Sequence, residues 1–404
     1  MAAALLTTTC CVVGGGPAGM MLGLLLARAE VDVTVLEKHG DFLRDFRGDT
    51  VHASTLELMH ELGLLDEFLR RPHQELRQLS VQVGDETVPV GDFTHLPTHC
   101  KFIALMPQWD FLDFLADHAK RLPNFRLLMR TEGKGLLYNG DGVAGVSAHS
   151  PDGELEIRAP LVVATDGRHS SMREAAGLKV IDRGAPMDVL WLRVSRRDSD
   201  PAQTLGRVGA GHMLVTLDRG DYWQCGYVIA KGGFDSLRDR GIDALRESLV
   251  SLAPHFRDRI DEIASWDDVH LLTVAVNRLE CWYQRGLLLI GDAAHAMSPV
   301  GGIGINLAVQ DAVATANILG PRLRQGAVTV ADLHAVQRRR ELPTRLTQAA
   351  QVLIQNLVIS NVLQSTAKPR PPWLVRMLGR YPWLQRLPAR AVGIGVRPEH
   401  VRPV

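Results

Sequence analysis

The chain is poor in cysteine, with five in 404 residues and no pair at C-x-x-C spacing. Cys10 and Cys11 are adjacent in an apolar run, where they behave as small apolar residues. This distribution matches neither a zinc motif nor a dithiol redox motif. We therefore expect reduced cysteines, no metal site and a cytoplasmic location.

Net charge is also absent, because 45 Lys and Arg residues balance 45 Asp and Glu residues. A neutral chain lacks the general electrostatic footprint of nucleic-acid binding. No apolar run reaches the ~18 residues of a transmembrane helix. The apolar N-terminus has no basic region and leads into a glycine turn, which predicts a buried strand and not a signal peptide. The apolar fraction of 46% and the charged fraction of 22% are typical of a soluble globular protein, and the length favours two or more domains.

The segment 10–38 is the most informative part of the sequence. It reads as an apolar strand, a glycine turn, an apolar helix and a second strand, Val31 to Leu36. Gly14, Gly16 and Gly19 have the G-x-G-x-x-G spacing of dinucleotide-binding proteins. In that motif the glycines permit a tight turn, approach of a pyrophosphate to the backbone, and close packing of helix on strand.

The glycine turn leads into a helix whose first N–H groups attract phosphates. Glu37 ends the second strand, where a carboxylate can accept hydrogen bonds from ribose hydroxyls. These features predict a dinucleotide site, against the alternative of a glycine-rich turn in another α/β protein. The motif alone does not separate FAD from NAD.

Two later apolar strands end in glycine and aspartate. Leu161 to Ala164 is followed by Asp166-Gly167, and Leu287 to Ile290 by Gly291-Asp292. The second strand has no polar residue, which is typical of a central strand buried on both faces. A loop from Pro299 to Gly304 then precedes a predicted helix from Ile305 to Leu319.

A second sheet is expected between residues 177 and 268, where β-type segments surround a helix from Ile242 to Leu252. Residues 79–103, with a turn at Gly84-Asp85, add a hairpin to it. We expect this sheet to be antiparallel and inserted into the nucleotide-binding domain. The predicted domains are 1–78, 104–176 and 269–330 for the cofactor, 79–103 and 177–268 for the substrate, and 331–404 as a helical region.

Three separated stretches share one family pattern: GGGPAG with Glu37, ATDGRHSSMR, and GLLLIGDAAHAMSPVGGIGINLAVQDA. Together they resemble the single-component FAD-dependent aromatic hydroxylases of the para-hydroxybenzoate hydroxylase type, over about residues 10 to 320. The resemblance implies an α/β fold with a Rossmann-like FAD domain of parallel sheet and an antiparallel substrate sheet. It also implies tightly but non-covalently bound FAD, and NAD(P)H as a transient co-substrate.

The resemblance assigns cofactor contacts residue by residue. Asp292 matches the residue that binds ribityl and ribose hydroxyls, Pro299 the proline whose carbonyl faces the flavin, and Arg47 an arginine on the phosphates. The full set implied for FAD is Gly14, Gly16, Pro17, Ala18, Gly19, Glu37, Lys38, Arg47, Gln108, Asp166, Gly167, Arg173, Gly291, Asp292, Pro299, Gly302, Gly304, Ile305 and Asn306.

The implied reaction is hydroxylation of an aromatic or polyketide-like small molecule. NAD(P)H reduces FAD, O₂ adds to give a C4a-hydroperoxide, and its distal oxygen passes to the substrate. Such an intermediate must be shielded from water. Pro299 and Gly302 are expected beside the flavin. His295 is a candidate general base for a phenol, although a packing role for it is favoured.

The substrate pocket is expected between the flavin and the second sheet. Strand alternation groups Trp191 with Arg193, and Trp223 with Cys225 and Tyr227. The candidate substrate contacts are Trp191, Arg193, Trp223 and Tyr227. The sequence does not say which face is inward, and ordinary packing competes for each residue.

Other flavoproteins share this pattern. A halogenase would carry a W-x-W-x-I-P stretch, and the sequence around Trp191 does not fit it. The sequence leaves two alternative functions, a prenyl-chain reductase and a non-catalytic flavin sensor. A monomer and a homodimer are both compatible with the sequence. The apolar segment 349–364 is interpreted as a docked helix, with the alternative that it borders the pocket of an apolar substrate or contacts a membrane surface.

Overall fold

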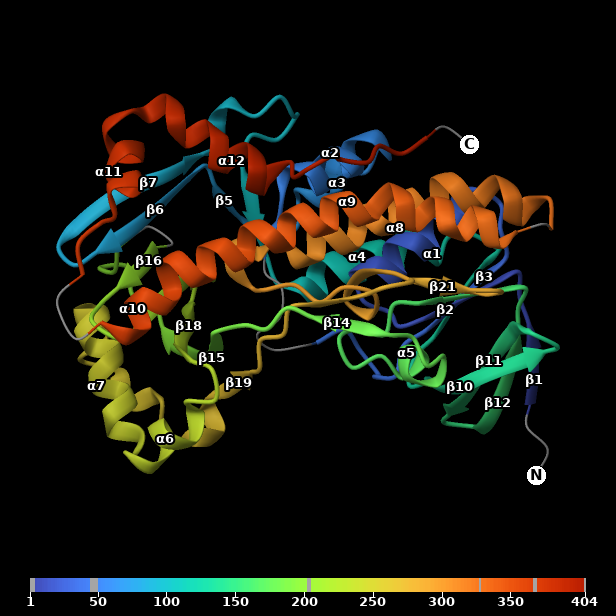
Figure 1. Ribbon diagram of the computed structural model, residues 1–404, viewed down its shortest axis with the longest axis horizontal. Helices are drawn as coiled ribbons and strands as arrows, with labels where there is room; N and C mark the ends of the chain where they lie inside the picture. The colour runs from blue at the N-terminus through green and yellow to red at the C-terminus, as the bar shows by residue number, and fades with distance from the viewer. Residues whose placement is uncertain (1–3, 44–49, 202–204, 327, 366–368, 403–404) are drawn as a thin grey trace.

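The computed structural model describes residues 4–43, 50–201, 205–326, 328–365 and 369–402. Two long helices, α8 (Gly304–Arg324) and α9 (Val330–Ile354), run along the molecule. Figure 1 shows α9 extending from the side of the N-terminal sheets towards the second large sheet, where α10 (Ser360–Gln364) continues it. The two helices therefore span both halves of the fold.

The first half is organised on a six-stranded sheet. Its order is β21 (Tyr283–Gln284), β22 (Leu287–Leu289), β13 (Leu161–Ala164), β2 (Cys10–Val13), β3 (Val33–Leu36) and β9 (Phe125–Leu128). All pairs are parallel except β21 with β22. Every residue of β2, β3, β13 and β22 is buried. Burial on both faces explains why β3 does not alternate as its sequence suggested.

Helices cover this sheet. α1 (Pro17–Arg28) packs against both α8 and α4 (Gln108–Ala119). A four-stranded sheet, of order β1 (Ala4–Thr7), β12 (Gly153–Arg158), β11 (Gly142–Ser150) and β10 (Glu132–Asn139), contacts β13 through β11. The short helix α5 (Ser171–Ala175) begins at Ser170, whose hydroxyl accepts from the Arg173 amide, as expected for a cap.

The second half contains a seven-stranded sheet. Its order is β19 (His270–Leu272), β15 (Met187–Ser195), β18 (Tyr222–Ala230), β17 (Met213–Asp218), β16 (Leu205–Val208), β6 (Gln78–Val83) and β7 (Glu86–Asp92). The predicted hairpin joins it, but the pairing of β16 with β6 is parallel. The sheet is therefore mixed and not antiparallel throughout. Helices α6 (Phe234–Asp239) and α7 (Ile242–Leu252) pack against one face.

Three segments differ from the sequence interpretation. Residues 93–102 leave the second sheet, and β8 (Ile103–Leu105) pairs instead with β4 (Thr50–Val51) and β5 (Gln74–Leu76). Residues 269–282 alternate and predict one strand of the second sheet. They are instead divided between β19 and β20 (Asn277–Leu279), and β20 pairs with β14 (Val180–Asp182). Leu56, Met59, Leu62 and Leu65 recur at helical spacing and predict one helix with Gly63 near its end. α2 (Ala53–Glu61) does end near Gly63, whose φ is +71°, but Leu65 belongs to a separate short helix, α3 (Leu65–Phe68).

The C-terminal part of the described chain is mainly helical. A π-helical turn, Gln355–Ile359, joins α9 to α10, and α11 (Trp373–Arg380) and α12 (Arg386–Gly393) lie beside β7. Within the described residues, none of the helices has the length and apolarity needed to cross a bilayer. The five cysteines are free thiols, and burial raises the pKa of Cys11 to about 12.

Candidate cofactor and active site

The glycine turn between β2 and α1 is sterically specified. Gly14 has a φ of +110°, and a Cβ there would lie 2.6 Å from the Thr165 carbonyl oxygen. A Cβ at Gly19 would lie 1.9 Å from the Gly14 oxygen. Gly16 is different, because its backbone is extended and a Cβ would meet no atom within 4 Å. The space beside Gly16, at the start of α1, fits a phosphate group.

Glu37 is fixed at the edge of this turn. Its Oε2 accepts a hydrogen bond from the Gly15 amide at 3.1 Å, and its Oε1 accepts one from His39 at 2.9 Å. Lys38 follows on the surface. The carboxylate is therefore held beside the glycine turn, where its contact with a ribose stays a prediction.

The Asp166-Gly167 segment closes the end of β13 against β2. The Thr165 hydroxyl donates to the carbonyls of Val13 at 3.0 Å and Gly14 at 2.7 Å. Asp166 Oδ2 accepts from the Met172 amide at 3.2 Å. Asp166 Oδ1 is buried without a hydrogen-bond partner in the described part of the chain. A buried acceptor of this kind matches a ligand hydroxyl or N–H group.

The Gly291-Asp292 segment lies against the glycine turn. Gly291 has a φ of +59°, and a Cβ there would lie 3.2 Å from the Cβ of Ala308 and 3.4 Å from that of Ala18. Asp292 Oδ2 is 3.7 Å from Arg168 Nη2. Two motifs that are far apart in sequence thus meet at the start of α1.

Arg173 joins the two aspartate segments by backbone contacts. Its Nη1 donates to the Ala293 carbonyl at 3.2 Å and its Nη2 to the Arg168 carbonyl at 2.6 Å. Its guanidinium is thus engaged in fixing two loops. Gln108 begins α4, as expected for a residue at a helix start. Arg47 lies outside the described residues.

The glycine loop before α8 is held against the segment of β4 and α2. The Thr50 hydroxyl donates to the Gly302 carbonyl at 3.0 Å, and a Cβ at Gly302 would lie 2.4 Å from that hydroxyl. Asn306 Oδ1 accepts from the His52 amide at 2.9 Å and from the Thr55 hydroxyl at 2.7 Å. The Asn306 amide therefore links α8 to α2, while Gly304 and Ile305 are half-buried at the helix start.

A row of glutamines on α9 and at the start of the π-helical turn that follows it also holds this loop, and the sequence interpretation missed it. Gln351 Nε2 donates to the carbonyls of Ser298 at 3.0 Å and Val300 at 2.9 Å, and its Oε1 accepts from the Ser298 amide at 3.2 Å. Gln348 donates to the Ala296 carbonyl at 3.1 Å, and Gln355 to the Ser298 hydroxyl. The backbone around Pro299 is thus positioned by side chains of a helix outside the family motifs.

A signal for this row was present. Buried polar residues recur on α9 every three or four positions, at Gln337, Arg340, Thr344, Gln348 and Gln351. That is the period of one helix face. The expected apolar inner face is instead polar, and Leu342, Leu346 and Leu353 are exposed on the outside.

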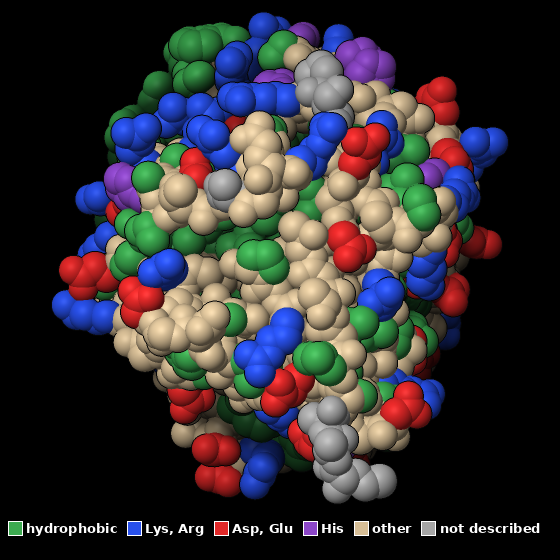
Figure 2. All heavy atoms as spheres, turned by 90° about the vertical axis from the view of Figure 1, so that its right-hand side faces the viewer, with side chains coloured by type: hydrophobic (Ala, Val, Ile, Leu, Met, Phe, Trp, Pro, Cys, Tyr) green, Lys and Arg blue, Asp and Glu red, His purple; other side chains and the backbone are tan. Residues whose placement is uncertain are grey.

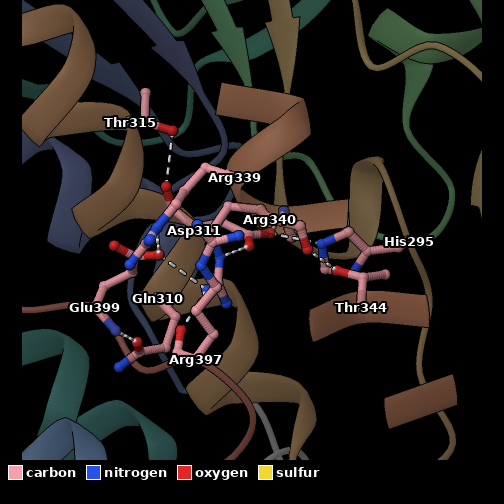
Figure 3. A network of polar contacts seen from close by, with 10 residues as sticks. His295, Gln310, Asp311, Thr315, Arg339, Arg340, Thr344, Arg397 and Glu399 are labelled. Carbon is pink, nitrogen blue, oxygen red and sulfur yellow. Dashed lines mark hydrogen bonds and ion pairs between the residues drawn. The ribbon is translucent and has the colours of Figure 1, made fainter. Parts of the chain in front are cut away.

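His295 belongs to a buried ionic network, shown in Figure 3. Its Nε2 is 2.6 Å from Asp311 Oδ2, which also accepts from the Gly291 amide at 3.1 Å. Arg340 Nε donates to Asp311 Oδ1 at 2.9 Å and its Nη1 to Glu399 at 3.2 Å. Burial alone would raise the pKa of Asp311, but His295 and Arg340 outweigh it and lower that pKa.

The geometry favours a structural part for His295 over proton abstraction from a substrate. Its side chain is 1% exposed, and its ring lies 4.9 Å from that of Trp282. Through Asp311 it helps to fix the Gly291 amide. The network also reaches Glu399, so the end of the chain is tied to the Gly291-Asp292 segment.

The second sheet separates the four candidate substrate residues. Trp223 and Tyr227 are buried in the apolar cluster beneath α7, and Trp223 Nε1 donates to Asp200 at 2.8 Å. Trp191 packs in the cluster on the other face, which includes Val300 of the glycine loop. Arg193, two residues further on β15, lies over the Tyr222 ring at 5.0 Å. Trp191, and not Trp223 or Tyr227, shares a cluster with the glycine loop.

His52 is completely buried beside Asn306. Its Nδ1 is 2.8 Å from the Val392 carbonyl of α12, so Nδ1 carries a hydrogen and donates it. Desolvation lowers the pKa of His52 to about 4, and the bond to Val392 offsets part of this effect. The ring is therefore neutral at physiological pH.

This burial predicts acid sensitivity. A histidine pKa that falls from about 6.5 in the unfolded chain to about 4 contributes stability above pH 6.5, which is lost as the pH falls towards 4. Between pH 6.5 and pH 5 the loss is about 2 kcal/mol. Denaturant unfolding of the wild type and of His52→Gln at both pH values measures it. Equal losses in the two proteins would contradict the assignment.

Comparison with known proteins adds to this geometry. The family model described as "FAD binding domain" matches residues 7–350. The chain is 32% identical over 372 residues to 6-methylpretetramide 4-monooxygenase of Streptomyces rimosus, covering 90% of this chain and 88% of that one. It is 26% identical to para-nitrophenol 4-monooxygenase of Pseudomonas sp. strain WBC-3, covering 80% and 81%.

A solved structure shares the fold. The crystal structure of p-nitrophenol 4-monooxygenase from Pseudomonas putida DLL-E4 superposes with a TM-score of 0.74 at 22% identity, covering 96% of this chain and 97% of that one. At this identity the likeness concerns the fold alone.

Proposed function

Because this chain belongs to the family of FAD-dependent aromatic hydroxylases, we propose that it uses NAD(P)H and O₂ to hydroxylate an aromatic or polyketide-like small molecule. A flavin monooxygenase is the activity class of this family. The proposal includes the use of a nicotinamide, the substrate class and the cytoplasmic location. It also includes the division into a cofactor domain, a substrate sheet and a helical region.

One observation carries the proposal most directly. Gly291 packs against Ala18 of the glycine turn, and Asp166 Oδ1, on the neighbouring strand end, is a buried acceptor without a hydrogen-bond partner among the described residues. The contact of these motifs fits an extended dinucleotide whose ADP part lies at Gly16 and whose ring lies towards the Pro299–Gly304 loop. The described residues thus fit FAD.

Each part of the chain has a task in this scheme. FAD, when bound, supplies the activation of oxygen. The Gly14–Gly19 turn and the start of α1 hold the phosphates, and Glu37 and Asp292 face hydroxyl groups. Gln351 and Thr50 fix the loop of Pro299 from two sides, so its amides are preorganised where charge develops. The apolar face of Trp191 excludes water.

We assign substrate contact to Trp191. Its indole N–H is buried without a hydrogen-bond partner in the described chain, and its ring lies against Gly226, where a Cβ would be 3.1 Å away. A carbonyl or hydroxyl oxygen of the substrate satisfies this donor. Arg193 lies further along the same strand, whereas Trp223 and Tyr227 act through packing.

A matched pair of substitutions tests this assignment. Trp191→Phe removes the unpartnered N–H, and we expect KM to rise about fivefold, as for one lost hydrogen bond, with unchanged stability. Trp223→Phe breaks the buried bond to Asp200 and is expected to lower the unfolding free energy by about 2 kcal/mol without raising KM. The reverse pattern would place the substrate beneath α7.

The function itself is tested by a substrate screen. The purified holoprotein is mixed with NADH or NADPH and a panel of phenols and fused-ring polyketides, and nicotinamide oxidation and product mass are followed. We expect substrate-stimulated oxidation and a mass gain of one oxygen atom. Failure of both nicotinamides to reduce the flavin with every ligand would favour a sensor over an enzyme.

A further inference from the structure

The last two helices expose an unusual set of large apolar side chains. α11 and α12 are joined by a turn at Pro382–Gln385. Trp373 is 68% exposed and Trp383 is 62% exposed, although tryptophan is normally well buried. The complete set, here called the C-terminal apolar face, is Trp373, Leu374, Met377, Tyr381, Trp383 and Leu387.

On α11, this face is separate from the face that packs against the rest of the protein. α11 contacts β7, and a Cβ at Gly379 would lie 3.0 Å from Val88. Val375 and Leu378 are half-buried, whereas Trp373, Leu374 and Met377 are exposed. With 100° between successive helical residues, these three occupy the flank next to the packed one. Packing among the described residues therefore does not account for them.

The segment that carries this face is basic. Residues 369–402 contain seven arginines and one carboxylate, Glu399. Glu399 is buried and paired with Arg339 and Arg340, so it does not offset the surface arginines. Arg376 and Arg380 are exposed on α11 itself. Figure 2 shows hydrophobic side chains gathered at the upper left edge of the molecule beside a row of Lys and Arg side chains.

We propose that the C-terminal apolar face docks on an anionic lipid surface. An amphipathic helix with Trp, Leu and Met on one side and arginines beside them lies in the plane of a membrane interface. Trp and Tyr prefer that interface because each has an apolar ring and a polar tip. Charge decides against a second copy, since a symmetric contact would bring the arginines of both chains together. In this proposal the protein lies on the surface of the membrane.

Vesicle binding of the full-length holoprotein tests the proposal. We expect flotation with vesicles of phosphatidylcholine and phosphatidylglycerol, little with phosphatidylcholine alone, and weakening by added salt. Arg376→Gln/Arg380→Gln is expected to lower the partition coefficient roughly thirtyfold, given the usual contribution of each basic residue near an anionic surface. Trp373→Ser/Trp383→Ser is expected to abolish binding.

Two controls separate this face from general surface effects. Leu5→Ser removes a side chain that is also 68% exposed, and Lys120→Gln/Arg126→Gln removes two exposed charges elsewhere. Both are expected to float like the wild type, and all variants to keep their FAD absorbance. Equal binding to both vesicle types would overturn the proposal. The proposal would also be overturned if the protein failed to float with vesicles but was captured by polyglutamate. A dimer in size-exclusion chromatography that Trp373→Ser/Trp383→Ser dissociates would overturn it as well.

Discussion

Gly16→Ala is expected to fold normally and to lose FAD. The extended backbone at Gly16 accepts alanine, and the added methyl meets no protein atom within 4 Å. That space is where we place the pyrophosphate, so the methyl is expected to clash with the cofactor alone. An overpacking cost of ~1–3 kcal/mol corresponds to roughly a tenfold to hundredfold rise in the dissociation constant for FAD.

Flavin absorbance per protein and titration of the apoprotein with FAD measure this effect. Gly91→Ala is the matched control, because its Cβ makes ordinary contact at 3.7 Å with Leu79 in the other large sheet. Gly19→Ala is expected to fail for a different reason, since its Cβ would lie 1.9 Å from the Gly14 carbonyl oxygen. Normal FAD affinity in Gly16→Ala would move the phosphates away from this turn.

Gln351→Met is expected to separate nicotinamide oxidation from hydroxylation. Methionine keeps the volume but removes all three hydrogen bonds to Ser298 and Val300. Buried backbone groups left without partners cost about 1–3 kcal/mol, so the loop around Pro299 is expected to lose its fixed position. A loosened loop admits water, and a larger share of the consumed O₂ is released as hydrogen peroxide.

Gln337→Met supplies the control on the same helix face. Gln337 is also buried and hydrogen-bonded. Its side chain donates to the Glu280 carbonyl and accepts from the Trp282 amide, each at 3.0 Å. Both variants are expected to lose about 2–4 kcal/mol of unfolding free energy, whereas peroxide release rises severalfold only in Gln351→Met. If nicotinamide oxidation stayed equally coupled to hydroxylation in the two variants, Gln351 would have only a structural role.

The parts of the fold that the sequence predicted have strong local signals. The strands Cys10–Val13 and Leu161–Ala164 and the helix Ile242–Leu252 are found with the predicted bounds. The turn residues at 139–142 and at 152–153 predict two hairpins, and both are present beside β11. In each, the hydrophobic period and the turn residues favour the same structure. The family resemblance to the FAD-dependent aromatic hydroxylases is likewise confirmed.

The parts that were missed depend on partners far away in sequence. Nothing near Arg207 indicates that β16 pairs in parallel with residues 80–83. The alternation in 269–282 predicts a strand but not its division between two sheets. The glutamines of α9 were overlooked because a buried helix face is normally apolar, and here the polar face is inside.

The contacts around His52 bear on how the protein is synthesised. Its backbone bonds to Asn306 across 254 residues, and its ring to Val392 across 340 residues. At roughly 5–20 residues per second, the ribosome needs about 20–70 s to make the chain between His52 and Val392. During that interval the His52 ring has no hydrogen-bond partner, and Arg340 can pair with Glu399 only after residue 399 has also been made. We therefore expect the nascent chain to hold its flavin stably only after residue 399 has been made.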